Sequence, residues 1–335
     1  LILFACLSLP VTAGNKTPSA VQDLQYGEVL FHFYQQDYFN SIIQLLKARS
    51  QERLPHHAEE AELLLGGLDL SYGLRNEAAA IFQRLLTRDR TEDAVRNRAW
   101  YYLAKIDWQR GDPERTLQIL EQIDGRVPGS IAAESVHLKS LALLQLGRHE
   151  EAIQLLQQTR GDKRWLPYLQ YNLGVAQLQG VQPAAGIKQL ERVGALRGHS
   201  DEARLLRDKA NLALGYSLLK DGHAVASRGA LERVRLQGPL SNKALLGTGW
   251  ADAEAGAYGR ALVPWTELSS RNATDPAVQE SMLAIPYAMA KMNLHGRAVE
   301  RYEQTIETLL IERRRLDESI LAIRAGGLLE ALLST

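Results

Sequence analysis

The chain has 335 residues, with 39 lysines and arginines against 39 aspartates and glutamates and a single cysteine. This charge balance gives no broad positive field of the kind that binds nucleic acid without sequence preference, so no nucleic-acid partner is expected. Apolar residues make up 45% of the chain and charged residues 23%, which excludes disordered and collagen-like chains. No apolar run reaches the roughly 20 residues that span a bilayer, so we expect no transmembrane helix in the mature chain.

Residues 1–13 have the pattern of the end of a signal peptide. The apolar run Leu1–Pro10 is followed by Val11-Thr12-Ala13, a small-x-small pattern typical of a cleavage site. We predict cleavage after Ala13, export, and a periplasmic mature chain that starts at Gly14. Because the sequence has no initiator methionine and no basic residue before the apolar run, we expect it to begin inside the signal peptide.

A lipoprotein is the alternative for this segment. In Leu3-Phe4-Ala5-Cys6 the cysteine would be acylated, although the bulky Phe4 fits such a site poorly. Under either interpretation the mature chain has no cysteine pair. We therefore expect no disulfide, no thiol catalysis and no cysteine-based zinc site.

One motif, a small residue followed four positions later by a bulky residue, recurs along the chain. The clearest copies are Ala78 with Phe82, Ala152 with Leu156, Ala261 with Trp265, and Ala298 with Tyr302. Weaker copies begin at Ser41, Thr116, Gly186 and Ser227. These eight first positions, which we call the anchors, are 34 to 41 residues apart. Such a period predicts eight copies of one supersecondary unit.

A second position lies twelve residues before each anchor, and we call these the paired positions. They are small in six of eight units: Val29, Gly66, Ala104, Ser140, Gly174, Gly215, Gly249 and Pro286. Two small positions per unit allow two antiparallel helices to approach closely. Glycines and prolines at the unit junctions predict where these helices end, and no alternating strand pattern lies between them. The predicted fold class is therefore all-α.

This pattern resembles the tetratricopeptide repeat, whose consensus is W-x2-L-G-x2-Y, then A-x3-F, then P. Its clearest carriers are Trp100-x2-Leu103-Ala104 with Gly111 and Pro128, Leu173-Gly174, and Leu214-Gly215 with Gly222 and Pro239. The resemblance covers about residues 22–305 and departs at the consensus tyrosine, where aspartate, leucine, glutamine or methionine stands instead. It implies a right-handed α-solenoid of about eight helix-turn-helix units over residues 14–305.

Two segments depart from the regular period. Seven extra residues separate Gly186 from Ser227, which is about two helical turns, so we expect longer helices there and no domain boundary. After the eighth unit, helical character continues without a stop until Gly326-Gly327. Residues 306–335 are predicted to form a long capping or coiled-coil-like helix, and we expect the natural chain to continue beyond them.

Motifs for catalysis, cofactors or metals do not stand out. No two histidines have the i, i+4 spacing of a helical metal site, and His56-His57 with Glu59 and Glu60 falls in an inter-repeat turn, where exposed polar residues are expected. No nucleophile elbow, P-loop or dinucleotide fingerprint is present. We therefore expect no catalytic residue, no metal and no cofactor, and no small-molecule ligand.

The resemblance also implies that the first helix of each unit lines a concave face. Counting from the anchors places one row at Lys105, Leu141, Val175, Tyr216, Trp250 and Tyr287, and another at Tyr101, His137, Tyr171, Leu212, Leu246 and Leu283. Tryptophan and tyrosine are favoured anchors of protein interfaces. The alternative is that these side chains pack against the next repeat. The predicted partner-binding residues, centred on Trp250, are Tyr101, Lys105, Tyr171, Tyr216, Trp250 and Tyr287.

Two functions from different classes follow. The first is a non-enzymatic scaffold of the Gram-negative cell envelope, which binds a segment of a periplasmic or outer-membrane protein partner in its groove. The alternative is a polysaccharide-export or cell-wall glycan-associated protein whose aromatic rings stack on sugars, although only Asp252 and Glu254 supply carboxylates close to Trp250 in sequence. An enzyme with a helical substrate domain is a third interpretation.

Overall fold

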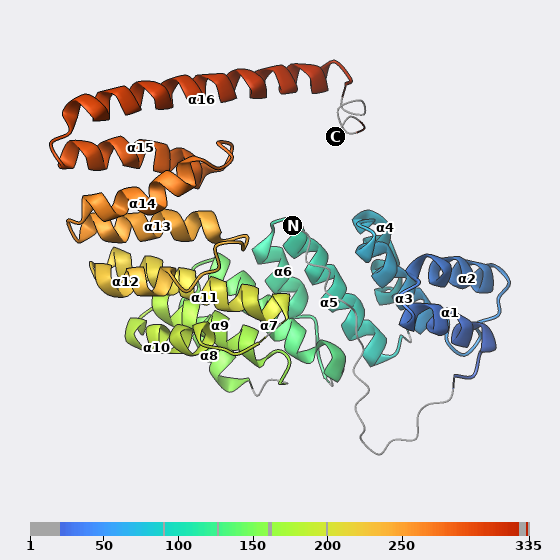
Figure 1. The fold of residues 1–335 in the computed structure, drawn as a ribbon. Coiled ribbons are helices and arrows are strands. Elements are labelled where there is room, and N and C mark those ends of the chain that lie inside the picture. The colour runs from blue at the N-terminus through green and yellow to red at the C-terminus, as the bar shows by residue number, and fades with distance from the viewer. Residues whose placement is uncertain are drawn as a thin grey trace. The chain divides into compact units, whose positions relative to one another are not determined.

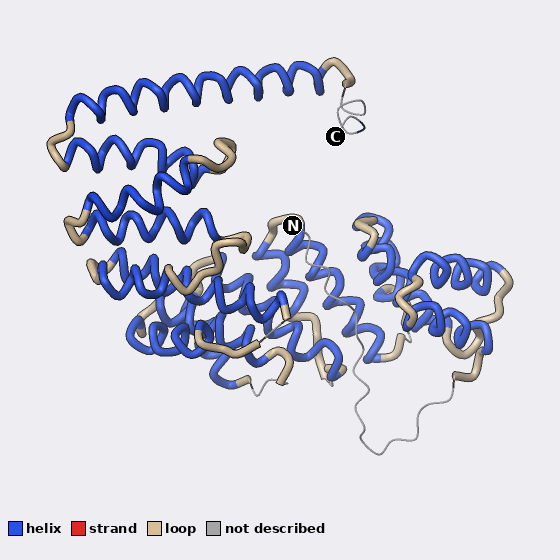
Figure 2. The backbone as a smooth tube through the Cα atoms, viewed as in Figure 1, coloured by secondary structure: helices blue, strands red, loops and turns tan. Residues whose placement is uncertain are grey.

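The computed structural model describes residues 21–89, 91–125, 127–159, 163–198 and 200–327, together with residue 333. These residues form 16 helices and no strand, which confirms the predicted all-α fold (Figures 1 and 2). None of the helices described is long and apolar enough to cross a membrane. The predicted cleavage site after Ala13 and the alternative lipid site at Cys6 both lie outside the described residues.

The chain divides into two compact units, Leu1–Ala176 and Gln177–Thr335, which we call unit 1 and unit 2. Unit 1 contains α1 (Leu24–Tyr34), α2 (Tyr38–Ser50), α3 (Ala58–Ser71), α4 (Arg75–Leu86), α5 (Asp93–Gln109), α6 (Pro113–Leu120), α7 (Gly129–Gln145), α8 (His149–Gln158) and most of α9 (Leu166–Gln179). Unit 2 contains α10 (Pro183–Gly194), α11 (Asp201–Lys220), α12 (Ala224–Leu231), α13 (Ser241–Glu254), α14 (Tyr258–Ser269), α15 (Pro276–Lys291) and α16 (His295–Arg324).

Each predicted repeat is a pair of helices, with the paired position on the first helix and the anchor on the second. The eight anchors and the eight paired positions are all buried, although they are spread over the whole series from α1 to α16. From α1 to α8 and from α10 to α16, consecutive helices pack against one another, so each pair covers the apolar face of the next. The predicted solenoid of about eight helix-turn-helix units is confirmed.

The glycines at paired positions are required by close helix contact. A Cβ atom built on Gly66 would lie 2.6 Å from the ring of Phe82, and one on Gly249 would lie 2.2 Å from Nε1 of Trp265. Both contacts join a paired position to the bulky residue that follows the anchor. Trp265 is fully buried, and its Nε1–H donates to the backbone oxygen of Leu246 at 3.1 Å. Any larger residue at these glycines would push the two helices of the unit apart.

The weaker copies of the motif keep the same contact with different chemistry. The hydroxyl of Ser41 donates to the carbonyl oxygen of Val29 at 3.0 Å, and that of Ser227 donates to the carbonyl of Gly215 at 2.8 Å. In both cases the acceptor is the paired position twelve residues earlier. Serine therefore replaces alanine at an anchor because its buried hydroxyl finds a hydrogen-bond acceptor on the neighbouring helix.

Two buried carboxylates of unit 2 form ion pairs with arginines. Asp252, which stands where the repeat consensus has tyrosine, is buried and pairs with Arg228 on α12 and with Arg260 on α14, the latter at 3.4 Å. Asp208 on α11 is fully buried and accepts from Nε of Arg235 at 2.7 Å. The Asp252–Arg228 pair joins adjacent helix pairs at a position where the consensus ring is missing.

The two irregular segments are accommodated by longer helices. Helix α11 has 20 residues and is the longest first helix of the described repeats, so the extra residues before Ser227 lengthen a helix as predicted. Helix α16 has 30 residues and buries Ala298 and Thr305 before continuing with an exposed second half. The boundary predicted between residues 305 and 306 therefore lies inside one continuous helix.

Candidate partner-binding site

Three predicted site residues lie on successive first helices of unit 2: Tyr216 on α11, Trp250 on α13 and Tyr287 on α15. Helix α13 packs against both α11 and α15, so these three helices lie side by side. The three side chains occupy equivalent positions, each one residue after a paired position. We call Tyr216, Trp250 and Tyr287 the aromatic row.

Trp250 is half-buried and is held from three directions. Its ring meets the fully buried Trp265 edge-to-face, with centroids 4.9 Å apart, and lies 6.0 Å from the ring of Tyr287. Its Nε1–H donates to Oε1 of Glu280 at 2.7 Å. The residue therefore belongs partly to the core and partly to the surface, because one edge packs on the inner tryptophan while the opposite side faces α15.

Tyr287 and Leu283 form the exposed part of the site. They lie one turn apart on α15 and are 36% and 47% exposed. The Tyr287 ring lies 6.3 Å from that of Tyr258, and Nζ of Lys291 lies 5.6 Å from its centroid. Two large apolar side chains are thus open to a partner, with a cation at one end.

Tyr216 is half-buried, and its hydroxyl is already engaged. That hydroxyl donates to the backbone oxygen of Lys243 on α13 at 2.8 Å. Burial, with a further contribution from the negative charge of Glu280, raises the pKa of Tyr216 to about 12. The ring edge also covers Gly247, where an added Cβ would lie 3.1 Å from Cζ of Tyr216. Tyr216 therefore borders the site mainly as a packed ring.

Glu280 is the residue of this site that sequence reasoning missed. It binds the Trp250 indole, and its charge acts on Tyr216, so it links α15 to both other helices of the row. Glu280 lies seven residues before Tyr287, which is two helical turns and hence the same face of α15. That spacing is the signal that could have identified it.

The predicted site residues of unit 1 have a different environment. Tyr101 is 5% exposed, and its hydroxyl donates to Oε2 of Glu134 on α7 at 2.8 Å. The expectation that it is a surface residue is wrong, because the next first helix covers it. Burial raises the pKa of Tyr101 well above its usual value, and the nearby carboxylate of Glu134 adds to this.

Lys105 and Tyr171 are half-buried. Burial lowers the pKa of Lys105, and the charge of Glu134 partly offsets this. Burial also raises the pKa of Tyr171. No described contact joins Lys105 or Tyr171 to an exposed aromatic side chain. In this respect they differ from the aromatic row of unit 2.

The second predicted row is largely not a surface row. Leu246 is buried, and its carbonyl receives the indole N–H of Trp265, while Leu212 and His137 are half-buried. His137 instead belongs to an aromatic cluster in unit 1, with Trp165 at 5.2 Å and Tyr168 at 5.9 Å between ring centroids. Leu283 on α15 is the exposed leucine of this row.

The histidines and carboxylates of the described residues are expected to lack a metal site. No group of three or more histidine, cysteine, aspartate or glutamate side chains in this part of the chain could hold a metal ion. At the His56-His57 pair, both backbone N–H groups donate to Oδ2 of Asp23 at 3.0 Å, and the His57 ring stacks on Tyr26 at 4.7 Å. This histidine pair therefore fastens the turn to α1.

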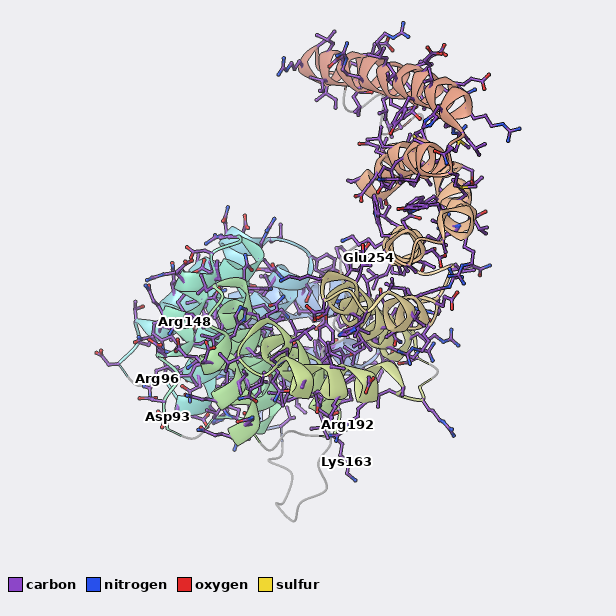
Figure 3. All side chains as sticks on the ribbon, turned by 90° about the vertical axis from the view of Figure 1, so that its left-hand side faces the viewer. Asp93, Arg96, Arg148, Lys163, Arg192 and Glu254 are labelled. Carbon is purple, nitrogen blue, oxygen red and sulfur yellow. The ribbon has the colours of Figure 1, made fainter. Side chains whose placement is uncertain are left out.

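The charged surface residues labelled in Figure 3 project outward from their own units, for example Arg148 in unit 1 and Glu254 in unit 2.

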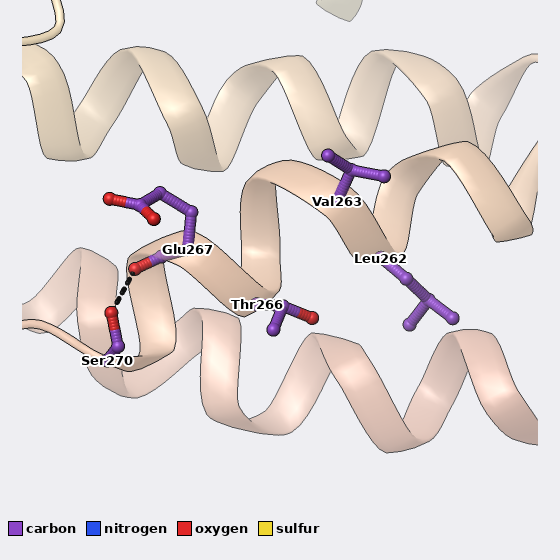
Figure 4. A pocket seen from close by; sticks show the side chains of 5 residues that line it. All are labelled: Leu262, Val263, Thr266, Glu267 and Ser270. Atoms are coloured by element: carbon purple, nitrogen blue, oxygen red, sulfur yellow. Dashed lines mark hydrogen bonds between the residues drawn. The ribbon is translucent and has the colours of Figure 1, made fainter.

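A shallow depression on α14 is lined by five residues of one helix and its cap: Leu262, Val263, Thr266, Glu267 and Ser270 (Figure 4). The only interaction drawn among them is from the Ser270 hydroxyl to the backbone oxygen of Glu267, at 2.7 Å. This surface lacks the enclosure and convergent polar groups of a small-molecule site.

Comparison with known proteins finds a family match for part of unit 2. Residues 212–272, which include Tyr216 and Trp250, match the sequence profile of the tetratricopeptide repeat. No curated protein sequence matches the chain.

Solved structures are similar to the chain at low sequence identity. A tetratricopeptide repeat protein from Parabacteroides merdae is 11% identical with a TM-score of 0.52, over 79% of this chain and 98% of its own. The quorum sensor NprR from B. thuringiensis, in its apo form, is 8% identical with a TM-score of 0.51, over 85% of this chain and 97% of its own. PilF from Pseudomonas aeruginosa is 19% identical with a TM-score of 0.48, over 67% and 96%. Residues 212–272 therefore match the tetratricopeptide repeat family, and over 79% of its length the chain has the α-solenoid fold of a solved tetratricopeptide repeat protein.

Proposed function

We propose that this chain is a non-enzymatic protein-interaction scaffold of the Gram-negative cell envelope that binds a segment of a protein partner across the first helices of unit 2. Tetratricopeptide repeats generally mediate protein–protein interactions, which supports a protein ligand. The observation that carries the proposal is the surface formed by Leu283, Tyr287 and Trp250, in which two exposed apolar side chains adjoin a ring already fixed in place.

Preorganisation makes this surface a suitable anchor. Trp250 is held by Trp265 and Glu280, so little side-chain freedom is left to lose when a partner binds. A segment laid across successive repeats contacts one or two side chains of each repeat. Large rings at equivalent positions then provide one contact point per repeat along the segment. The ammonium of Lys291 beside Tyr287 favours a segment with an acidic residue next to its apolar anchor.

The glycan alternative has no comparable support. Stacking on a sugar requires an open ring face, whereas the Trp250 ring lies against Trp265 and Tyr287. Glu280, the carboxylate beside it, is already bound to the indole N–H. The arrangement suits an apolar side chain of a partner better than a sugar ring.

Site-specific photo-crosslinking tests the binding site. A photoreactive phenylalanine at position 287 should form an adduct with one protein in living cells, and Trp250→Ala should reduce that adduct at least about tenfold. The same probe at position 72 is the matched control, since Tyr72 is also an exposed tyrosine but lies in unit 1. Equal labelling from both positions would show that the aromatic row is not the partner-binding site. Labelling at position 287 that does not change in the Trp250→Ala variant would show the same.

Export is tested independently of binding. Supported by the apolar start and the Val11-Thr12-Ala13 site, we propose that the mature chain begins at Gly14 in the periplasm. The intact mass of protein made from the natural gene measures this directly. A diacylglycerol adduct on Cys6 would indicate the lipoprotein instead, and an uncleaved cytoplasmic chain would contradict both.

A further inference from the structure

The second half of α16 carries an apolar surface that no described helix covers. Helix α16 has 30 residues and α15 has 16, so α16 continues about 21 Å past its neighbour at 1.5 Å per residue (Figure 1). Its contact with α15 is made through Ala298 and Thr305, both buried. Large apolar side chains beyond them remain exposed, among them Ile306 at 56% and Leu316 at 52%.

These side chains follow a heptad repeat. Positions a are Val299, Ile306, Arg313 and Ile320, and positions d are Tyr302, Leu309, Leu316 and Ile323. Seven of the eight are apolar or aromatic, and Leu309 is half-buried while the other six are exposed. An apolar a/d stripe sustained for three to four heptads is the pattern of a coiled-coil seam. Arg313 breaks the stripe once, and its long stem can lie along the seam while its charge reaches water.

We propose that α16 pairs with α16 of a second copy of this chain as an antiparallel coiled coil. The charges beside the seam decide the direction. In a parallel pair, Glu312 at position g would face Asp317 at position e of the second copy, and two copies of Arg313 would share one core layer. Like charges at both places oppose that arrangement.

One antiparallel alignment removes these conflicts. It places Ile306 opposite Ile323 of the second copy and Leu309 opposite Ile320, and it sets Arg313 against Leu316. At the flanking e positions, Glu303 then faces Arg324 of the second copy, and two-fold symmetry produces this attraction twice. Glu303 and Arg324 are exposed and free to pair in this way. In the alignment shifted by one heptad, Glu303 would face Asp317 of the second copy, and Glu312 would face Glu312 of the second copy. These like charges disfavour that alignment.

Two leucines of the same helix provide a matched test of the seam. Leu316 is on the seam at position d, whereas Leu321 is off it at position b, and both are exposed. Leu316→Glu should raise the dimer dissociation constant about a hundredfold, because both copies lose a buried leucine, while Leu321→Glu should change it less than about threefold. Sedimentation equilibrium on the full chain measures this, and circular dichroism verifies that each exposed-site variant folds.

A charge exchange tests the direction. Glu303→Arg and Arg324→Glu should each weaken the dimer about tenfold, and the double variant should restore it, since the pair is then reversed but complementary. Three outcomes overturn the proposal: a monomeric wild-type chain at 100 μM, equal effects of Leu316→Glu and Leu321→Glu, or a double variant no stronger than either single one. A monomer whose α16 instead crosslinks to another protein assigns the seam to that partner.

Discussion

Gly249→Ala tests the close helix contact that underlies the repeat. The new Cβ would lie 2.2 Å from Nε1 and 2.4 Å from Cε2 of Trp265, which is fully buried and cannot rotate into solvent. Overpacking of this kind costs about 1–3 kcal/mol. Displacing the ring would also break its 3.1 Å hydrogen bond to the Leu246 carbonyl, which lowers the free energy of unfolding by about 1 kcal/mol.

One effect acts in the opposite direction. Alanine is about 1 kcal/mol more favourable than glycine inside a helix, which offsets part of the cost. The expected net loss for Gly249→Ala is therefore about 1–3 kcal/mol, or roughly 3–10 °C in the melting temperature of a unit of this size.

Gly229→Ala is the matched control in the same unit. Gly229 lies within α12, and an added Cβ there meets no atom within 4 Å. This substitution should raise the free energy of unfolding by about 0.5–1 kcal/mol. Urea unfolding followed by tryptophan fluorescence measures both variants. If Gly249→Ala were as stable as Gly229→Ala, the inferred contact between α13 and α14 would be wrong.

The remaining predictions concern buried polar groups. Asp252→Asn should lower the free energy of unfolding by about 1–3 kcal/mol in chemical denaturation, less than for a fully buried pair because Arg228 is partly exposed. Ser227→Ala should change the free energy of unfolding by less than about 1 kcal/mol, because it removes one hydrogen bond to Gly215 but introduces the consensus alanine. A larger loss would contradict the equivalence of serine and alanine at the anchors. An unfolded tyrosine titrates near 10 and folded Tyr216 near 12, so the unfolded state loses its proton first and unit 2 should lose stability between pH 10 and 12. Urea midpoints at pH 9, 10 and 11 should fall less steeply in Tyr216→Phe, and parallel slopes would refute this assignment.

The repeat architecture could be predicted because its determinants are close together in the sequence. Gly66 meets Phe82 sixteen residues later, and Ser227 bonds to Gly215 twelve residues earlier. Each contact stays within one helix pair, and the same spacing recurs in every pair. Small residues at a fixed interval therefore predict the close contact between the two helices of each pair. This holds even in the pair where Asp252 replaces the consensus tyrosine.

The surroundings of the candidate site depend on residues from the next pair. The sequence by itself determined the helical faces on which Tyr101 and Trp250 lie, since the period of 3.6 residues sets the direction of each side chain. Only the tertiary structure decided that Glu134, 33 residues later, receives the Tyr101 hydroxyl in a covered position, and that Glu280, 30 residues later, holds Trp250 at a partly open one. Helical periodicity fixes where a side chain points, but whether it is buried depends on what the neighbouring helix places opposite, and no spacing within one repeat encodes that.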